Sequence, residues 1–285
     1  MILDKIALGT ANFDSNYGLF PSNFKVKTKV KNLLIFCKQN KIDTIDTSPD
    51  YKNAEILLGN AGCRGFNLIT KIPNLSKVKI LNDNFIKETI SQSLENLKLK
   101  KIYALLFRDP KNLVNNKLNL WQQAQEFKNK GIIKKIGVTI YDVRDLDVCF
   151  DVLKPDLVQI PYNVFDRRLE ISQYLRKLHS KKIEVHCRSV FLQGLLLKEK
   201  HELPLKFSKY KKLWEKYYSW LQQNNLNSLE ACINFILRKK EISRMVLGVE
   251  SIFQLKKILL ISSKNIKFPD FSENIDEELI DPRKW

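Results

Sequence analysis

The chain has 285 residues, enough for one large domain or two small ones with a substantial core. Its formal net charge is +18, and none of its apolar runs approaches the roughly 20 residues that a membrane span needs. The N-terminus lacks the long apolar stretch of a secretory signal, so the sequence predicts a soluble, cytoplasmic protein that does not insert into a membrane.

The basic residues are spread along nearly every predicted helix, together with many Asn and Ile residues. Such dispersed charge indicates a solvated basic surface, not a nucleic-acid groove, although its field would attract anionic substrates or cofactors. The five cysteines stand singly without a CxxC pair, and the three histidines make no HExxH spacing. We therefore expect no nucleic-acid partner, no disulfide framework and no metal site.

Short apolar segments alternate with amphipathic stretches along the whole chain. Eight segments are predicted strands: 6–10, 42–46, 67–71, 103–107, 133–138, 157–161, 183–188 and 245–248. The amphipathic stretches predict helices at 29–39, 85–97, 120–130, 143–153 and 171–178, with Gly131 ending the third. Eight such units predict an α/β protein with a closed (β/α)₈ TIM barrel, whereas an open doubly wound sheet is the competing fold.

The first predicted strand is not followed by a GxGxxG motif, which argues against the dinucleotide-binding version of the open sheet. Helical stretches at 205–223 and 228–240 precede the eighth predicted strand, so we expect a helical insertion after strand 7. No linker or internal repeat divides the sequence. We therefore predict a single domain over residues 1–285.

Two neighbouring predicted strands end in residues suited to proton transfer. The strand at 42–46 ends at Asp46, and Tyr51 follows it in a polar turn, while the strand at 67–71 ends at Lys71. A phenol with a pKa near 10 is a poor acid at neutral pH, and a cation held beside it lowers that pKa. Asp46 could pair with Lys71 and hold it beneath Tyr51.

This arrangement resembles the signature of the aldo-keto reductases. The signature consists of an Asp at a strand end, a Tyr five residues later, a Glu, a Leu-Gly pair and a Lys at the end of the next strand. The matching residues here are Asp46, Tyr51, Glu55, Leu58 with Gly59, and Lys71. The resemblance implies NAD(P)H-dependent reduction of an aldehyde or ketone, a small-molecule carbonyl substrate, with Tyr51 as the general acid.

Segments of the second half resemble the family's cofactor loops. Gly137-Val138-Thr139 and Gln159 match positions that contact the nicotinamide amide, residues 188–195 match the loop around the pyrophosphate, and residues 246–251 match the loop before the adenosine-binding helix. Ser251 and Gln254 also form a plausible capping box for that helix. The cofactor-binding residues implied by the resemblance are Gly9, Thr10, Thr139, Gln159, Arg188, Ser189, Phe191, Gln193, Gly194, Gly248, Glu250, Ser251 and Gln254.

Three positions depart from the family pattern. The fourth strand of the family ends in a histidine that orients the substrate carbonyl, and the sequence comparison assigns Phe107 to that position, with Arg108 on the opposite face. Ile140 replaces a common Asn, and Glu250 lies where many members bind the adenosine 2′-phosphate through Lys or Arg. NADPH is the cofactor that the family implies, and NADH is the alternative.

Phe107 cannot donate a hydrogen bond, and the loss of a positioned donor typically slows a reaction by about a hundredfold or more. The alternative function is therefore a catalytically impaired, nucleotide-binding barrel with a regulatory or assembly role. The loop at 188–195 and the C-terminal tail resemble a bacterial branch encountered beside surface-polysaccharide enzymes, which suggests a sugar-derived carbonyl. Candidate walls of the substrate pocket are Asn12, Tyr17 and Trp285.

Overall fold

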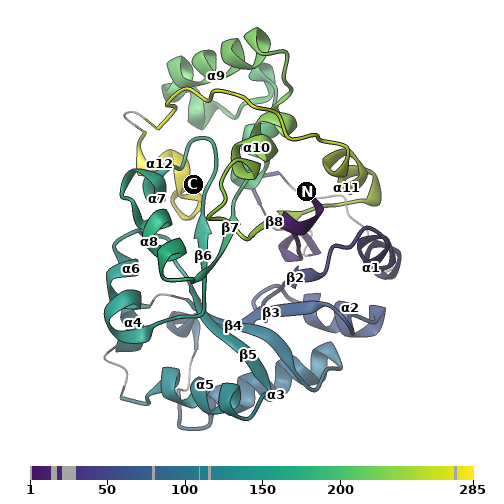
Figure 1. Ribbon diagram of the computed structural model, residues 1–285, viewed down its shortest axis with the longest axis vertical. Helices are drawn as coiled ribbons and strands as arrows, with labels where there is room; N and C mark the ends of the chain where they lie inside the picture. Colours follow the sequence, from purple (N-terminus) through teal and green to yellow (C-terminus); the bar gives the residue numbers. More distant parts are fainter. Residues whose placement is uncertain are drawn as a thin grey trace.

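Eight parallel strands close into one barrel (Figure 1). The computed structural model describes residues 2–13, 18–20, 30–78, 81–108, 110–114, 117–272 and 275–285. Each strand pairs with the next, and β8 pairs back with β1, which confirms the predicted (β/α)₈ barrel. The strands are β1 (Ile6–Gly9), β2 (Thr44–Asp46), β3 (Asn67–Lys71), β4 (Ile102–Arg108), β5 (Ile133–Thr139), β6 (Leu157–Pro161), β7 (Glu184–Arg188) and β8 (Arg244–Gly248).

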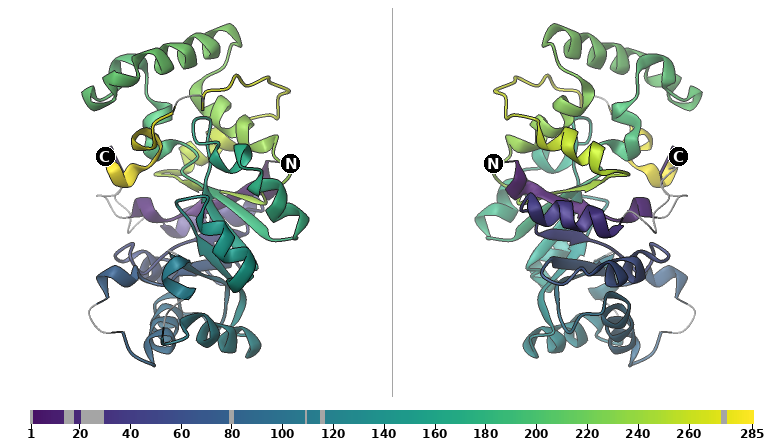
Figure 2. Two further views of the ribbon diagram at one scale, coloured as in Figure 1. Left: turned by 90° about the vertical axis from the view of Figure 1, so that its left-hand side faces the viewer. Right: turned by 90° about the vertical axis from the view of Figure 1, so that its right-hand side faces the viewer.

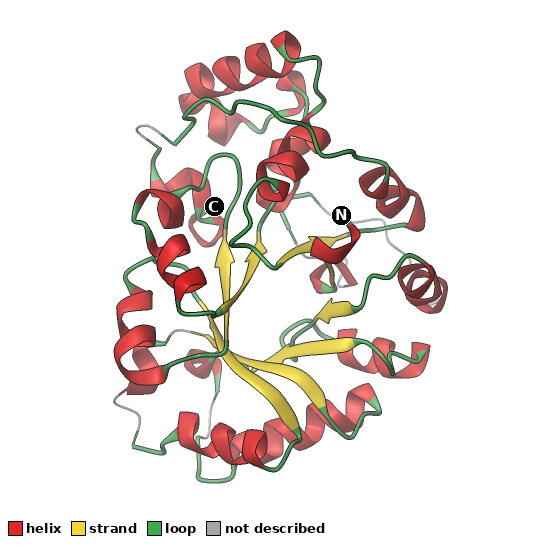
Figure 3. Cartoon of the chain, in the orientation of Figure 1, coloured by secondary structure: helices red, strands yellow, loops and turns green. Residues whose placement is uncertain are grey.

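Helices surround the barrel (Figure 3). They are α1 (Val30–Gln39), α2 (Ala54–Ala61), α3 (Phe85–Leu97), α4 (Lys111–Val114), α5 (Leu120–Asn129), α6 (Asp145–Val148), α7 (Arg168–Ile171), α8 (Tyr174–Ser180), α9 (Lys211–Gln223), α10 (Ser228–Leu237), α11 (Ile252–Leu259) and α12 (Glu277–Ile280). The predicted insertion between β7 and β8 includes α9 and α10, and α9 stands at the end of the molecule opposite α3 and α5 (Figures 1 and 2). Among the described helices, none is long and apolar enough to cross a membrane.

Several predicted helix boundaries differ from the observed ones. The helix expected at 143–153 is α6 followed by a π-helical turn, Cys149–Leu153. The helix expected at 171–178 is interrupted at Gln173, where a positive φ of 62° separates α7 from α8. Gly131 has a φ of 71° just after α5, which confirms its predicted place at the helix end.

The barrel strands are buried on both faces. A small cluster fills the interior and consists of Ile69, Ala104, Leu106 and Leu157, each completely buried. A much larger core lies between the strands and the helices. Successive residues of β4 therefore point alternately into the barrel interior and towards the helix layer. At the end of the strand, Phe107 and Arg108 must point to opposite sides.

Gly59 explains why a Leu-Gly pair follows the tyrosine turn. A Cβ at this position would lie 2.1 Å from the carbonyl oxygen of Asn96, at the end of α3. Only glycine permits this close approach of α2 to α3. The close packing of α2 fixes the helix that follows the Tyr51 turn, and it thereby supports the geometry of the turn itself.

Candidate active site

Asp46 and Lys71 form a buried ion pair at the carboxyl ends of β2 and β3. The Lys71 Nζ lies 2.6 Å from Asp46 Oδ1 and also donates to the carbonyl oxygen of Thr47 at 2.8 Å. Both residues are at most 3% exposed. Burial lowers the pKa of Lys71, and the adjacent Asp46 carboxylate opposes that change. The predicted contact between the two strand ends is present.

Gln159 completes this pair from the opposite side of the barrel. Its Nε2 donates to Asp46 Oδ2 at 2.7 Å, so each oxygen of the carboxylate accepts a hydrogen bond. The family resemblance assigned Gln159 to the cofactor amide, whereas the structure gives its amide nitrogen to Asp46. We call this group of Asp46, Lys71 and Gln159 the upper network.

Tyr51 lies in the turn after β2, partly buried, with the Lys71 Nζ 5.3 Å from the centre of its ring. Burial raises the pKa of Tyr51 above its ordinary value, and the Asp46 carboxylate adds to the rise. The guanidinium charges that oppose the rise belong to Arg108 and Arg188. The sequence argument assigned this role to Lys71 alone, whose charge is engaged by Asp46.

The end of β4 presents Arg108, not Phe107, to the mouth of the barrel. Phe107 is completely buried in the outer core, with its ring centre 5.5 Å from that of Trp121 on α5. Arg108 has the same parity as the interior residues Ala104 and Leu106. The two side chains do lie on opposite faces, as expected, but the assignment of the faces is reversed. The impaired-barrel hypothesis rested on Phe107 standing in the site, and Phe107 is outside it.

Arg108 reaches across to the turn that carries Tyr51. One terminal nitrogen donates to Ser48 Oγ at 3.1 Å and lies 3.2 Å from Asp50 Oδ2. Its Nε is buried and has no hydrogen-bond partner among the described residues. The charge of Arg108 was the signal that sequence reasoning missed, because a charged side chain is far less costly at the open mouth than in the helix layer.

Arg188 ends β7 and is held by neutral oxygens. It donates to the carbonyl oxygen of Ile140 at 2.9 Å and, at 3.4 Å, to the hydroxyls of Thr139 and Ser189. Its guanidinium carbon lies 4.2 Å above the centre of the Tyr141 ring. Thr139 therefore positions Arg188.

A groove of about 910 Å³ runs from Tyr51 towards α11. Most of the predicted site residues line it: Gly9, Thr10, Asp46, Tyr51, Gln159, Arg188, Ser189, Phe191, Gln193, Gly194, Gly248, Glu250 and Gln254. Four do not, because Lys71 lies behind Asp46, Thr139 contacts Arg188, Ser251 caps α11, and Phe107 is in the outer core.

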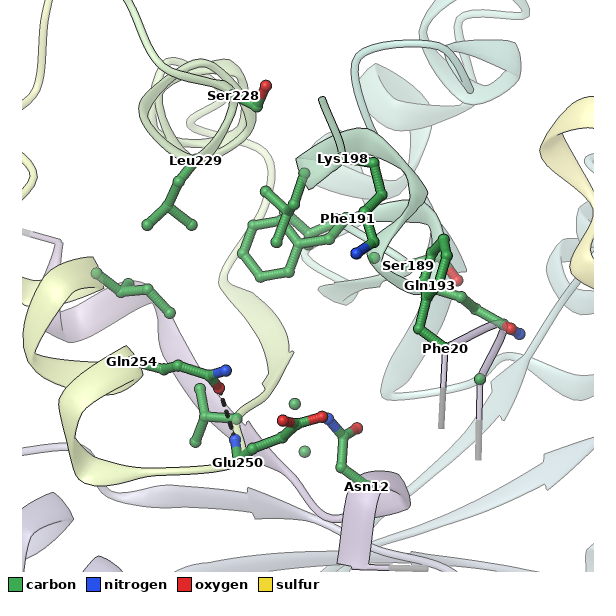
Figure 4. A pocket seen from close by; sticks show the side chains of 18 of the residues that line it. Asn12, Phe20, Ser189, Phe191, Gln193, Lys198, Ser228, Leu229, Glu250 and Gln254 are labelled. Atoms are coloured by element: carbon green, nitrogen blue, oxygen red, sulfur yellow. Dashed lines mark hydrogen bonds between the residues drawn. The ribbon is translucent and has the colours of Figure 1, made fainter. Parts of the chain in front are cut away.

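The α11 end of the groove combines acidic, amide and basic groups (Figure 4). The Ser251 side chain accepts a hydrogen bond from Gln254 N at 3.2 Å, as predicted. The Gln254 side chain accepts from Glu250 N at 2.7 Å, whereas a capping box would have it accept from Ser251 N. Glu250 lies beside Asn12 (Figure 4). A Cβ on Gly248 would lie 2.3 Å from Asn12 Oδ1, so a larger residue there would require the Asn12 side chain to move.

Sequence reasoning missed three lysines that line the groove, namely Lys198, Lys200 and Lys257. Lysine is so frequent in this chain that no single one stood out, although Lys257 follows Gln254 by one helical turn on α11. Lys198 and Lys200 form ion pairs with Glu202 and Glu215. The features that fit an anionic dinucleotide are therefore Lys257, the glycines at the ends of β1 and β8, and the volume of the groove. Lys198 also lies 4.5 Å from the ring centre of Phe20, which lines the same groove.

The remaining candidate walls have different positions. Asn12 lines the groove, and the ring of Trp285 packs against that of Phe207 at 5.1 Å. Tyr17 lies outside the described residues. Within the described part of the chain, no group of three or more His, Cys, Asp or Glu side chains is arranged to hold a metal ion.

Comparison with known proteins places this geometry in a family. A model described as "Aldo/keto reductase family" matches residues 5–277. No curated protein was found to match the sequence. Among solved structures, an aldo-keto reductase from Bacillus halodurans in its holo form is similar with a TM-score of 0.72 and 17% identity, over 99% of this chain and 95% of that one. A glycerol dehydrogenase from Gluconobacter oxydans is similar with a TM-score of 0.71 and 17% identity, over 94% and 92%.

Proposed function

The chain belongs to the aldo/keto reductase family and is an oxidoreductase, and from that premise we propose that it reduces an aldehyde or ketone with NAD(P)H and uses Tyr51 as the proton donor. The family acts on small-molecule carbonyl compounds. The observation that carries the proposal is the position of Tyr51, which lies above the upper network and lines the groove suited to a dinucleotide.

Tyr51 is protonated at neutral pH, because burial and the Asp46 carboxylate raise its pKa. A protonated phenol can donate its hydrogen to the carbonyl oxygen as negative charge develops there. The bound nicotinamide would supply the hydride. Oxidation of an alcohol in the reverse direction uses the same residues.

The surrounding positive charges stabilise the phenolate that remains after proton transfer. Arg108 and Arg188 act directly, since both charges favour ionised Tyr51. Lys71 acts at 5.3 Å from the Tyr51 ring, and Asp46 holds it in that position. The upper network is thus a positioning device for the acid, with its polar atoms fixed before substrate arrives.

NADPH is the proposed cofactor, with Lys257 as the partner of the adenosine 2′-phosphate. The supporting observation is that Lys257 lines the α11 end of the groove. Glu250 lines the same end of the groove and favours NADH, because its carboxylate would accept a hydrogen bond from a ribose hydroxyl and repel a phosphate. If Lys257 binds the phosphate, Lys257→Met should raise the KM for NADPH about tenfold and leave that for NADH unchanged. An unchanged KM for NADPH in Lys257→Met would exclude this role.

The decisive test of the reaction is Tyr51→Phe, assayed with a panel of aldehydes and sugar-derived ketones. Loss of the proton donor should lower kcat about 10²- to 10⁴-fold, with nucleotide binding retained. Tyr218→Phe is the matched control, because Tyr218 lines the groove but donates only to the carbonyl oxygen of Lys198. Full turnover in Tyr51→Phe would refute the mechanism. Nucleotide binding without turnover in the wild type would favour the non-catalytic barrel.

A further inference from the structure

The mouth of the barrel beside Tyr51 carries more positive than negative charge. Lys71 is balanced by Asp46, at 2.6 Å. Arg108 shares Asp50, at 3.2 Å, and that carboxylate is one-third exposed to solvent. Among the described residues, Arg188 forms no ion pair, and its three hydrogen bonds go to neutral oxygens. Counted over the described residues, the excess near Tyr51 is therefore one positive unit.

The donors of the two guanidinium groups are also incompletely used. Within the described part of the chain, the contacts of Arg108 with Ser48 and Asp50 both use one terminal nitrogen, and Nε is buried without a hydrogen bond. Two of the three hydrogen bonds of Arg188 are long, at 3.4 Å. A buried donor that lacks a partner is unfavourable by about 1–3 kcal/mol, so an acceptor supplied by a ligand would be favoured here.

Arg108 bonds to Ser48 in the turn that carries Tyr51, at 3.1 Å, and Arg188 lines the same groove as Tyr51. A substrate that presents its carbonyl oxygen to Tyr51 therefore brings its neighbouring substituents within reach of two guanidinium groups. A neutral carbonyl compound would leave the positive unit and the unbonded donors uncompensated. A carboxylate matches the positive unit with its one negative charge and the unbonded donors with its two coplanar acceptor oxygens.

Resting on the proposed reduction, we infer that the natural substrate is an oxo acid, with its carbonyl at Tyr51 and its carboxylate held by Arg108 and Arg188. A phosphate ester would bring nearly two negative charges next to Asp50, which already lies 3.2 Å from Arg108. The balance of charge thus selects a carboxylate. Arg108 and Arg188 are specificity-determining residues in this inference.

The first experiment compares pairs of aldehydes in which a carboxylate in one member takes the place of a methyl group in the other. Succinic semialdehyde and butanal have equal chain lengths, as do 4-carboxybenzaldehyde and 4-methylbenzaldehyde in the aromatic series. The wild type should reduce the acid of at least one pair with a kcat/KM about 10- to 100-fold higher, the size of a charge-assisted hydrogen bond. In Arg108→Met this ratio should fall towards one, even though turnover of both substrates changes.

Arg108→Lys separates charge from shape and also serves if the methionine variant folds poorly. It keeps the positive charge but loses the planar donors, so the acid-to-neutral ratio should take an intermediate value. Lys257→Met is the matched control, since it removes a cation at the far end of the groove and should leave the ratio unchanged. A wild-type ratio of one or less in both pairs, or a ratio unchanged in Arg108→Met, would overturn the inference.

A binding measurement tests the carboxylate site separately from the reductase activity. Calorimetric titration with benzoate and with benzamide, in the presence of NADP⁺, should show benzoate binding that weakens at least tenfold in Arg108→Met. If no aldehyde is reduced while Arg108-dependent benzoate binding remains, the reductase proposal fails and the carboxylate site stands. If aldehydes are reduced but benzoate binds no better than benzamide, the reductase proposal stands and the carboxylate site fails.

Discussion

Two ionic networks lie at opposite ends of the barrel, one buried and one partly buried, and they differ in what lies next to them. The upper network is at the carboxyl ends of the strands, where its carboxylate and amide line the groove. The lower network is at the strand starts, where Glu184 accepts from Tyr103 at 2.7 Å, contacts His186 Nε2 at 2.6 Å and is bonded to Lys135.

None of the residues of the lower network lines the groove. Both networks pair a carboxylate with a lysine inside the same barrel, so this chemistry alone does not define an active site. The upper network differs because the turn after β2 adds a phenol that faces a ligand-sized space. In barrels of this kind the carboxyl ends of the strands serve function and the amino ends serve stability. The expected effects of substitutions follow that division.

The largest effect is expected from Lys71→Met in the upper network. It leaves the Asp46 carboxylate buried without a counter-ion, which should lower the free energy of unfolding by about 3–5 kcal/mol. It should also lower kcat about 10²- to 10⁴-fold, because Tyr51 loses its positioned cation. Urea unfolding and single-turnover hydride transfer would measure the two effects.

The double variant Asp46→Asn with Lys71→Met sharpens this prediction. Removal of both charges should restore much of the stability, since no unpaired charge is buried, but it should not restore turnover. Recovery of activity along with stability would show that the pair serves only the fold.

Glu184→Gln in the lower network should lower the stability less than Lys71→Met does and leave turnover unchanged. Burial opposes the change, but hydrogen bonding and charge attraction from His186, with further hydrogen bonds from Lys135 and Tyr103, lower the pKa of Glu184 from its ordinary value to about 2. After a discount for solvent screening of this partly exposed carboxylate, the shift corresponds to about 1–2 kcal/mol of stability at neutral pH. The variant should lose about that much and keep its kcat per folded molecule. A fall in kcat comparable to that of Lys71→Met would contradict the division between the two ends.

The pH dependence of the unfolding free energy of the same variant tests the direction of the Glu184 pKa shift. Because the folded-state pKa of Glu184 is depressed, its contribution is complete above the unfolded-state pKa of about 4.5 and is lost as the pH falls towards 2. The difference in unfolding free energy between wild type and Glu184→Gln should therefore shrink between pH 5 and pH 3 (about the lower practical limit for urea unfolding). A difference that is constant over this range would assign the effect to packing.

The smallest effect is expected from Tyr103→Phe, which makes the same substitution as Tyr51→Phe at the other end of the barrel. It removes one hydrogen bond to Glu184 and should lower the free energy of unfolding by about 1 kcal/mol. Turnover should remain at the wild-type value. Thermal unfolding and steady-state kinetics on the two tyrosine variants provide the comparison, and a loss of turnover in Tyr103→Phe would show that the two ends are coupled.

The sequence predicted the barrel because alternating strand and helix patterns have few closed solutions. It also predicted the Asp46–Lys71 pair, because neighbouring parallel strands deliver their last residues to the same edge. The face of β4 was not predictable in the same way. Alternation separates Phe107 from Arg108, but both faces of a barrel strand are buried, so hydrophobicity does not say which face is the interior.

Other misses have local causes. Gln173 adopts a left-handed conformation that its residue type rarely requires, so the break between α7 and α8 has no sequence signal. The amide of Gln159 could reach either a cofactor or Asp46, and only the packed barrel distinguishes the two. The lysines of the groove were hidden by the abundance of lysine in the whole chain.

The hydrogen bond between Gln159 and Asp46 joins residues 113 positions apart in the chain. It links β6 to β2, so it can form only after the intervening strands have assembled in order. Contacts of such long sequence separation are slow to form, because the entropy of closing a long loop must be overcome first. Recovery of enzymatic activity during refolding should therefore lag behind the recovery of helical circular dichroism, and turnover becomes a reporter of barrel closure.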